Sequence, residues 1–366
     1  MNESSARLAR LLLLVVMFFP SAALLRAFDA STAALIKEGH YKRARAILAS
    51  RLKTNPNDAR SYEEMSKVSE AFARWDDAIQ QAEKATQLDR KTAEFQAALA
   101  DAIGSKLSGA QLGSFQKFSL ARRFKKEAEL ALQLDPDNVE ANQDLMEFHL
   151  DAPGILGGDK KRASELADHM VRINPVRGYL MKFEFATHEK QTGELESLLK
   201  RAMDADPKSY EAHLQAANFY LAKGRDRLPQ AEEQARRVMQ IAPGSVRGYT
   251  IMAAIYVQQG RWKELESLLG EAQRAVPDDL TPYYQAAKAI LAGNQGQELS
   301  RAERYIRTYL GQPPEGAEPT SAEGHRQLGL ILAKEGNKDQ AKQELQQALA
   351  LDSGFEAAKQ DLKRLR

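Results

Sequence analysis

The chain contains no cysteine among its 366 residues, which excludes disulfides and thiolate metal sites. The same absence excludes a cysteine nucleophile, and no Gly-x-Ser-x-Gly segment marks a serine nucleophile. Six histidines are present, but none has a partner at a metal-binding spacing. The sequence therefore offers no catalytic, metal-binding or cofactor-binding residue, and we expect a protein that is not an enzyme.

An excess of charge of one sign is also lacking. The chain has 52 Lys and Arg against 50 Asp and Glu, giving a formal charge of +2, and the two signs are interspersed. Without a basic tail or stripe, nucleic acid is not an expected partner. Hydrophobic residues at 43% and charged residues at 28% are ordinary for a folded domain, and good helix formers dominate the composition.

Long apolar runs are absent except near the N-terminus. Arg7 and Arg10 precede the apolar stretch Leu11–Phe19, and Pro20 and small residues follow it. This order predicts a secretory signal over residues 1–27. Even when extended to residue 25 the run has 15 residues, whereas a spanning helix needs roughly 20. A cleaved signal is expected, with an uncleaved anchor at residues 11–25 as the alternative. Either places the remainder in the periplasm or cell envelope, and the cysteine-free, signal-bearing sequence leads us to expect an exported bacterial protein.

Prolines recur in phase along most of the chain, at intervals of 39, 32, 36, 34 and 37 residues. Each is expected to close a stretch of helical pattern, because proline cannot continue the helical hydrogen-bond ladder. A period near 34 is typical of an array of helical repeats. The six prolines are Pro136, Pro175, Pro207, Pro243, Pro277 and Pro314.

The segment 246–279 shows the pattern of one repeat most clearly. Tyr249, Met252 and Tyr256 form an apolar stripe at helical spacing, Gly260 permits a turn, and Trp262 opens a second amphipathic helix. Gly, an aromatic residue, Ala and Pro at these offsets resemble the tetratricopeptide repeat. The same marks recur as Gly39, Tyr41, Ala44 and Pro56; as Ala73, Trp75, Ala78 and Ala85; and as Gly336, Ala341, Leu345 and Ala348.

The resemblance implies an all-α fold, a right-handed α-solenoid of about nine helix pairs with a capping helix at residues 355–366. A capping helix is expected because an open end of such an array exposes apolar surface. The units are placed at about 25–58, 59–92, 93–138, 139–175, 176–209, 210–245, 246–279, 280–316 and 322–355.

Four units exceed the period. The third gains an inserted loop at 104–118 and the fourth at 151–159; the sixth and eighth gain two and about three residues. The proline-rich segment 313–319 is expected to be a linker. Insertions in repeat arrays often fall on one face and can serve binding.

Two segments look like ligand loops but lack the residues that such loops need. Residues 154–161 lack the Gly-Lys-Ser/Thr ending of a phosphate loop, so we expect a turn with Asp159 as helix N-cap. Residues 135–138 lack the glycine and distal glutamate of a calcium loop, so we expect a turn with Asp137 or Asn138 as N-cap.

In proteins similar to this one, fixed positions of each leading helix line a concave groove. We expect a non-catalytic scaffold outside the cytoplasm whose groove binds a peptide or helix of a protein partner. The groove is expected to be acidic in the middle units and basic in the later ones, and Tyr284 is expected to lie outside the core. The candidate partner-binding residues are Glu184, Asn218, Arg247, Thr250, Tyr284, Lys288 and Arg326.

Two alternatives remain open. The first is a membrane-tethered assembly or secretion factor that uses an uncleaved N-terminus. The second is a polysaccharide-export or enzyme-associated subunit in which the inserted segments form the site. The sequence carries no indication of the oligomeric state.

Overall fold

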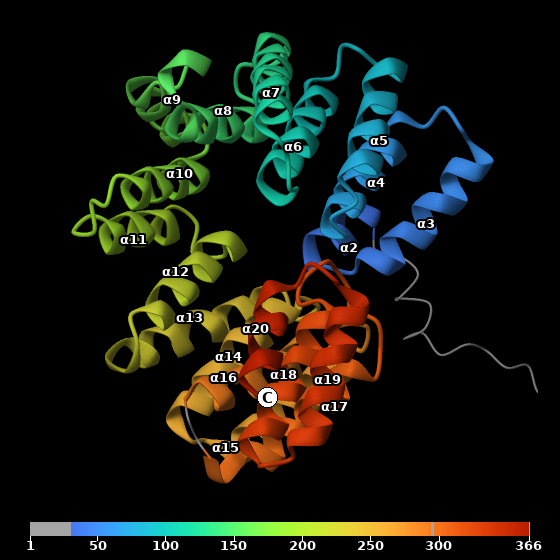
Figure 1. Ribbon diagram of the computed structural model, residues 1–366. Coiled ribbons are helices and arrows are strands. Elements are labelled where there is room, and N and C mark those ends of the chain that lie inside the picture. The colour runs from blue at the N-terminus through green and yellow to red at the C-terminus, as the bar shows by residue number, and fades with distance from the viewer. Residues whose placement is uncertain (1–30, 294–295, 366) are drawn as a thin grey trace, which may run out of the picture.

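The computed structural model describes residues 31–293 and 296–365, and within these ranges all regular structure is helical (Figure 1). The all-α expectation is confirmed. The predicted signal at residues 1–27 lies outside the described residues. Among the residues that are described, no helix combines the length and apolar character that a bilayer-spanning helix needs.

Successive α-helices pack as antiparallel pairs joined by short turns, which is the architecture of an α-solenoid. The pairs are α2 (Thr32–Glu38) with α3 (Tyr41–Thr54), α4 (Ala59–Ala71) with α5 (Trp75–Leu88), α6 (Ala93–Gly109) with α7 (Ser114–Leu134), α8 (Val139–Asp151) with α9 (Lys160–Ile173), α10 (Pro175–His188) with α11 (Leu195–Ala205), α12 (Tyr210–Ala222) with α13 (Leu228–Ile241), α14 (Val246–Gln259) with α15 (Trp262–Ala275), α16 (Thr281–Ala292) with α17 (Leu299–Leu310), and α18 (Ser321–Lys334) with α19 (Lys338–Leu351). A last helix, α20 (Glu356–Arg364), packs on α19. The fourth, sixth and eighth units each contain a short 3₁₀ turn between their two helices: η1 (Gly154–Leu156), η2 (Arg225–Arg227) and η3 (Gly296–Glu298).

Side-chain caps determine where several helices begin. Asp159 Oδ1 accepts hydrogen bonds from the backbone N–H groups of Lys161 at 2.9 Å and Arg162 at 3.2 Å, as predicted. Asn138 Oδ1 accepts from Ala141 N at 2.9 Å, so Asn138 and not Asp137 caps α8. Such caps stabilise a helix because its first N–H groups have no partner within the helix.

Pro175 lies just after the end of α9 at Ile173, as expected, and it also begins the next helix. It occupies the first turn of α10, and Asn174 caps that helix. Proline is tolerated there because the N–H group that it lacks would have had no partner in the helix anyway.

The segment 104–118 is not an inserted loop. It lengthens α6 to 17 residues and α7 to 21, and only four residues connect the two helices. A Cβ added at Gly104 would lie 2.8 Å from the Phe124 ring, and one at Gly109 would lie 2.4 Å from the Trp75 ring. These glycines permit close packing of aromatic rings against a continuous helix, whereas their sequence pattern indicated a loop.

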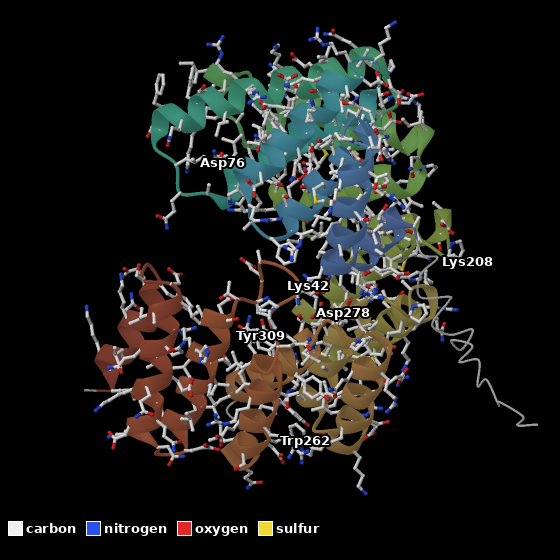
Figure 2. All side chains as sticks on the ribbon, turned by 90° about the vertical axis from the view of Figure 1, so that its right-hand side faces the viewer. Lys42, Asp76, Lys208, Trp262, Asp278 and Tyr309 are labelled. Carbon is white, nitrogen blue, oxygen red and sulfur yellow. The ribbon has the colours of Figure 1, made fainter. Side chains whose placement is uncertain are left out.

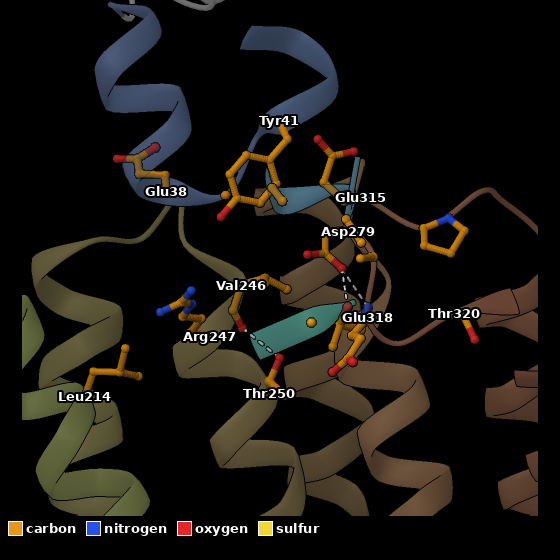
Figure 3. A pocket seen from close by; sticks show the side chains of 18 of the residues that line it. Glu38, Tyr41, Leu214, Val246, Arg247, Thr250, Asp279, Glu315, Glu318 and Thr320 are labelled. Atoms are coloured by element: carbon orange, nitrogen blue, oxygen red, sulfur yellow. Dashed lines mark hydrogen bonds between the residues drawn. The ribbon is translucent and has the colours of Figure 1, made fainter. Parts of the chain in front are cut away.

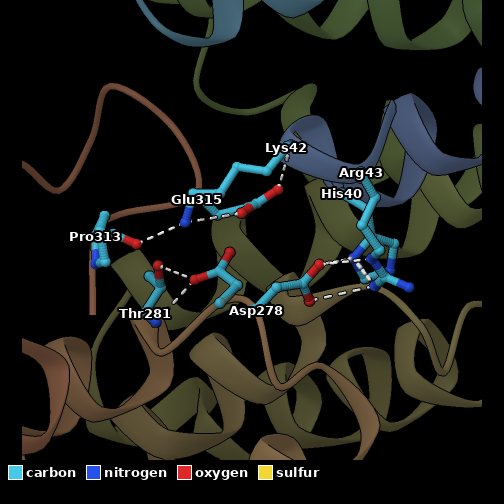
Figure 4. Close-up of polar contacts among 8 residues, drawn as sticks. His40, Lys42, Arg43, Asp278, Thr281, Pro313 and Glu315 are labelled. Atoms are coloured by element: carbon cyan, nitrogen blue, oxygen red, sulfur yellow. Dashed lines mark hydrogen bonds and ion pairs between the residues drawn. The ribbon is translucent and has the colours of Figure 1, made fainter. Parts of the chain in front are cut away.

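The solenoid curves until its first units contact its seventh and eighth (Figures 1 and 2). Arg43 Nε lies 2.7 Å from Asp278 Oδ2, and Lys42 N donates to Glu315 Oε1 at 2.7 Å. We call the interactions of residues 40–43 and 71 with residues 278 and 313–317 the closure contact, and Figure 4 shows those of His40, Lys42 and Arg43.

The expected linker at 313–319 is part of this contact and does not behave as a spacer. Ala317 N donates to Ala71 O at 2.7 Å, and Glu315 is only 4% exposed. Its prolines restrict the backbone of a segment that packs against another part of the chain. The expectation of a linker is therefore wrong.

Candidate functional site

Two cavities lie on the inner side of the curved array, one where the first two units meet the sixth to eighth and one along the fourth to seventh units. The larger has a volume of about 970 Å³ and extends from Tyr41 to Asn218, Arg247 and Thr250 (Figure 3). The smaller has about 570 Å³ and lies along α10, α12 and α14. Leu214 and Arg247 line both cavities, so the two adjoin, and together we call them the central groove.

Four of the seven predicted residues line the central groove. Asn218 and Arg247 are exposed in it, and Glu184 lines the smaller cavity. Thr250 lines the larger cavity and donates its hydroxyl hydrogen bond to Val246 O of its own helix at 3.0 Å. These residues come from the leading helices α10, α12 and α14, which present the same face to the interior.

The other three predicted residues do not line the central groove. Tyr284 is 8% exposed, and its ring lies 5.2 Å from that of Tyr309 in the core, so the expectation that it lies outside the core is wrong. Lys288 is exposed beside the Tyr284 ring but lines neither cavity. Arg326 Nε donates to Asp361 Oδ2 of α20 at 2.7 Å. The capping helix thus engages this arginine, a contact that repeat phase alone could not predict.

The expected change from acidic to basic along the groove is not observed. In the larger cavity Arg247 is the one cationic side chain among the described lining residues. The acidic residues that line the same cavity are Glu38, Asp279, Glu315, Glu318 and Asp352. Most of them reach the cavity because closure of the ring brings distant segments opposite α14, which the helical pattern of one unit does not reveal.

A second concentration of negative charge lies on the inner face of the second to fifth units. Burial, together with the negative charge of Asp101, raises the pKa of Glu70 to about 8. Burial together with the negative charge of Glu147 raises the pKa of Glu184 to about 7. Lys67 compensates part of this charge, since its Nζ lies 2.9 Å from Glu63 and 3.1 Å from Glu140. The face therefore favours cationic ligands.

The raised pKa of Glu70 predicts a pH dependence of stability. A carboxyl whose pKa is raised by folding binds more protons in the folded state, so the free energy of unfolding should fall as pH rises from 4.5 to about 8. Glu70→Gln, which keeps the hydrogen bond from Ser105, should flatten this dependence. Urea unfolding at several pH values measures it. Exposed Glu271→Gln is the control, and an equal slope in both variants would contradict the prediction.

In the described residues, no group of three or more His, Asp or Glu side chains could hold a metal ion.

The site consists of a polar and apolar groove within an α-solenoid, a class of fold that displays extended concave surfaces. One segment of the chain matches a known family: residues 322–355 match the model "Tetratricopeptide repeat", and this segment is the α18–α19 pair. The match covers one of the successive helix pairs of the chain.

Solved structures of several helical repeat proteins are similar to this chain at low identity. Yeast Tom70 is 14% identical with a TM-score of 0.49, over 91% of this chain and 79% of that one. A tetratricopeptide repeat protein from Parabacteroides merdae is 15% identical with a TM-score of 0.45, over 73% and 98%. Human IFIT1 dimer with m7Gppp-AAAA is 18% identical with a TM-score of 0.47, over 91% and 79%.

No curated protein matches the sequence. The matched helix pair and the successive pairs before it build an extended surface, which indicates a scaffold for interaction with other proteins.

Proposed function

We propose that the central groove binds an extended segment of a protein partner and that the protein acts as a non-catalytic scaffold. The observation that carries this proposal is that the two cavities adjoin at Leu214 and Arg247. Together they offer room for several residues of a ligand, and one wall consists of successive leading helices. Grooves lined by helices are a recurrent mode of peptide recognition.

The groove offers both polar and apolar contacts to such a segment. Asn218 can donate and accept hydrogen bonds at once, which suits the alternating N–H and C=O groups of a peptide backbone. Arg247 has no ion pair among the described residues and is available to a carboxylate of the ligand. Leu214, Val246 and Ile251 supply apolar surface beside them.

A double variant tests the groove directly. Asn218→Ala with Arg247→Ala should weaken partner binding on the order of tenfold or more, because one charged and one two-sided polar contact are lost. Both side chains are exposed, so the unfolding transition should not change. The measurement is photocrosslinking from a probe at Gln215, which lines the groove, followed by identification of the crosslinked species.

The matched control uses Lys288→Ala with Arg237→Ala, two exposed cations that do not line the groove. Crosslinking that survives in the groove variant and is lost in the control would overturn the proposal. Crosslinks to RNA in place of protein would also overturn it.

We further propose that the protein acts outside the cytoplasm, on the basis of the basic and apolar order in residues 1–27. Sequencing the N-terminus of the protein recovered from the cell envelope tests this. A start near Leu24 or Phe28 supports a cleaved signal. Retention of the first residues in a membrane fraction supports the tethered alternative, and recovery only from the cytoplasm contradicts both.

A further inference from the structure

The lengthened segments 104–118 and 151–159 meet in space, although they belong to different units. Together with the facing sides of α6, α7 and α8 they enclose a cavity of about 700 Å³. The cavity shares no lining residue with the central groove. We call it the insertion pocket, and its lining residues fall between Asp101 and Phe124 and between Asp144 and Leu156.

Exposed apolar side chains concentrate at the insertion pocket. Six large hydrophobic residues are exposed in the described part of the chain, and the two lengthened segments supply three of them. Ile155 is 89% exposed and Phe118 is 41% exposed, and both line the pocket. Phe115, 85% exposed, lies one helical turn before Phe118. Apolar surface gathered at one place and left in water marks an interaction site.

The inner wall of the pocket is acidic. Asp101, Asp144 and Glu147 line it, and Lys117 is the one cationic side chain among its described lining residues. Asp144 Oδ2 is buried without a hydrogen-bond partner, and neither Asp101 nor Asp144 has an ion pair in the part of the chain that is described. A buried carboxylate oxygen without a partner is costly, which favours a ligand that supplies a donor.

The pKa values agree with this geometry. Burial, with the negative charge of Glu140 next, raises the pKa of Asp101 to about 6. Burial, with the negative charge of Asp101 next, raises the pKa of Asp144 well above its usual range. Both shifts mean that the protein itself provides too little positive charge for these two carboxyl groups.

We propose that the insertion pocket is a second binding surface, which takes a basic amphipathic helix of a partner protein. Apolar side chains of that helix would pack on Phe118, Ile155 and the stacked rings of Phe124 and Phe148, whose centroids are 5.9 Å apart. A lysine or arginine one helical turn away would reach Asp101 and Asp144. A purely apolar ligand leaves the carboxyl groups unpaired, and the acidic wall repels nucleic acid. Charge complementarity therefore selects the basic amphipathic segment.

Binding of a synthetic helix tests the proposal without knowledge of the natural partner. The probe is a fluorescent amphipathic peptide of leucine and lysine, titrated into the full chain and followed by anisotropy. Asp101→Asn with Asp144→Asn should weaken its binding on the order of tenfold, as should Ile155→Ser with Phe118→Ser. A peptide with glutamate in place of lysine should not bind measurably at the same concentration.

Matched controls separate this pocket from general attraction by an acidic surface. Asp204→Asn removes an exposed carboxylate on α11, and Leu351→Ser removes an apolar side chain that is 52% exposed on α19. Neither should alter binding. The proposal is overturned if these controls lose as much affinity as the pocket variants, or if the pocket variants bind like the unmodified chain. Thermal unfolding checks that every variant is folded, and the Ile155 and Asp144 pairs test the pocket independently of each other.

Discussion

Replacing Gly178 with alanine is expected to destabilise the protein by about 3 kcal/mol. Gly178 lies on α10 where this helix crosses α9, and an added Cβ would lie 2.2 Å from Val171 N and 2.5 Å from Met170 C. These neighbours are backbone atoms, so no side-chain rotation can relieve the overlap. The two helices would have to separate, which would disturb the packing between the fourth and fifth units. Urea unfolding monitored by circular dichroism measures the loss.

Gly270→Ala is the matched control for that substitution. Gly270 also lies inside a helix, α15, but an added Cβ there would meet only Arg274 Nη1 at an ordinary 3.7 Å. Alanine should stabilise this position by about 0.5–1 kcal/mol, because glycine loses more backbone entropy on folding. Opposite signs at the two positions are the expected result. A stabilising Gly178→Ala would show that α9 and α10 are not in such close contact.

Opening of the ring is the second large effect that we expect, in the double variant Asp278→Ala with Lys42→Ala. Asp278 accepts from Arg43 Nε at 2.7 Å and lies 3.2 Å from His40 Nδ1, whereas Lys42 Nζ lies 3.1 Å from Glu315. Hydrogen bonds to charged groups of this kind contribute about 2 kcal/mol each. Removing both should separate the first units from the seventh and eighth. Small-angle X-ray scattering should then report a larger radius of gyration.

Glu303→Gln is a suitable control because it weakens an ion pair within one helix, the 2.8 Å contact between Arg307 and Glu303 of α17. It should leave the radius of gyration unchanged. If the double variant keeps the dimensions of the unmodified chain, the ion pairs of Asp278 and Lys42 are not what holds the first units against the seventh and eighth.

The pKa of Asp278 decides how far the pH can fall before the closure contact weakens. Burial opposes its ionisation, but hydrogen bonds from His40 and Arg43 outweigh that effect and hold the pKa of Asp278 below its usual range. The stabilisation by Asp278 is therefore fully present above the ordinary aspartate pKa and is lost as pH falls through the lowered one. Closure should accordingly persist at mildly acidic pH.

The local features of this protein could be predicted from sequence, because each depends on neighbours within one repeat. The stripe Tyr249, Met252 and Tyr256 is buried as expected, and Asp159 caps its helix. Long-range contacts could not be predicted in this way. Gly104 indicated a loop because the sequence around it does not reveal that the ring of Phe124, 20 positions later, packs against it.

The same dependence on long-range contacts explains why only some of the predicted residues line the central groove. Glu184, Asn218, Arg247 and Thr250 line the groove because helical phase within a unit decides which face they occupy. Arg326 is engaged by Asp361, a residue outside its repeat. The acidic residues opposite Arg247 come from units that are distant in the chain, so the electrostatics of the groove depend on curvature, which no single unit encodes.

Contact between the first and seventh units also limits how many repeats this chain can contain. An open solenoid can gain or lose a unit with little effect on distant ones, because each unit contacts only its neighbours. Here a unit added or removed between Arg43 and Asp278 would shift these two residues out of reach of each other along the superhelix. Changes of length should therefore be tolerated beyond the contact, towards α20, and within loops, but not as whole repeats inside the ring.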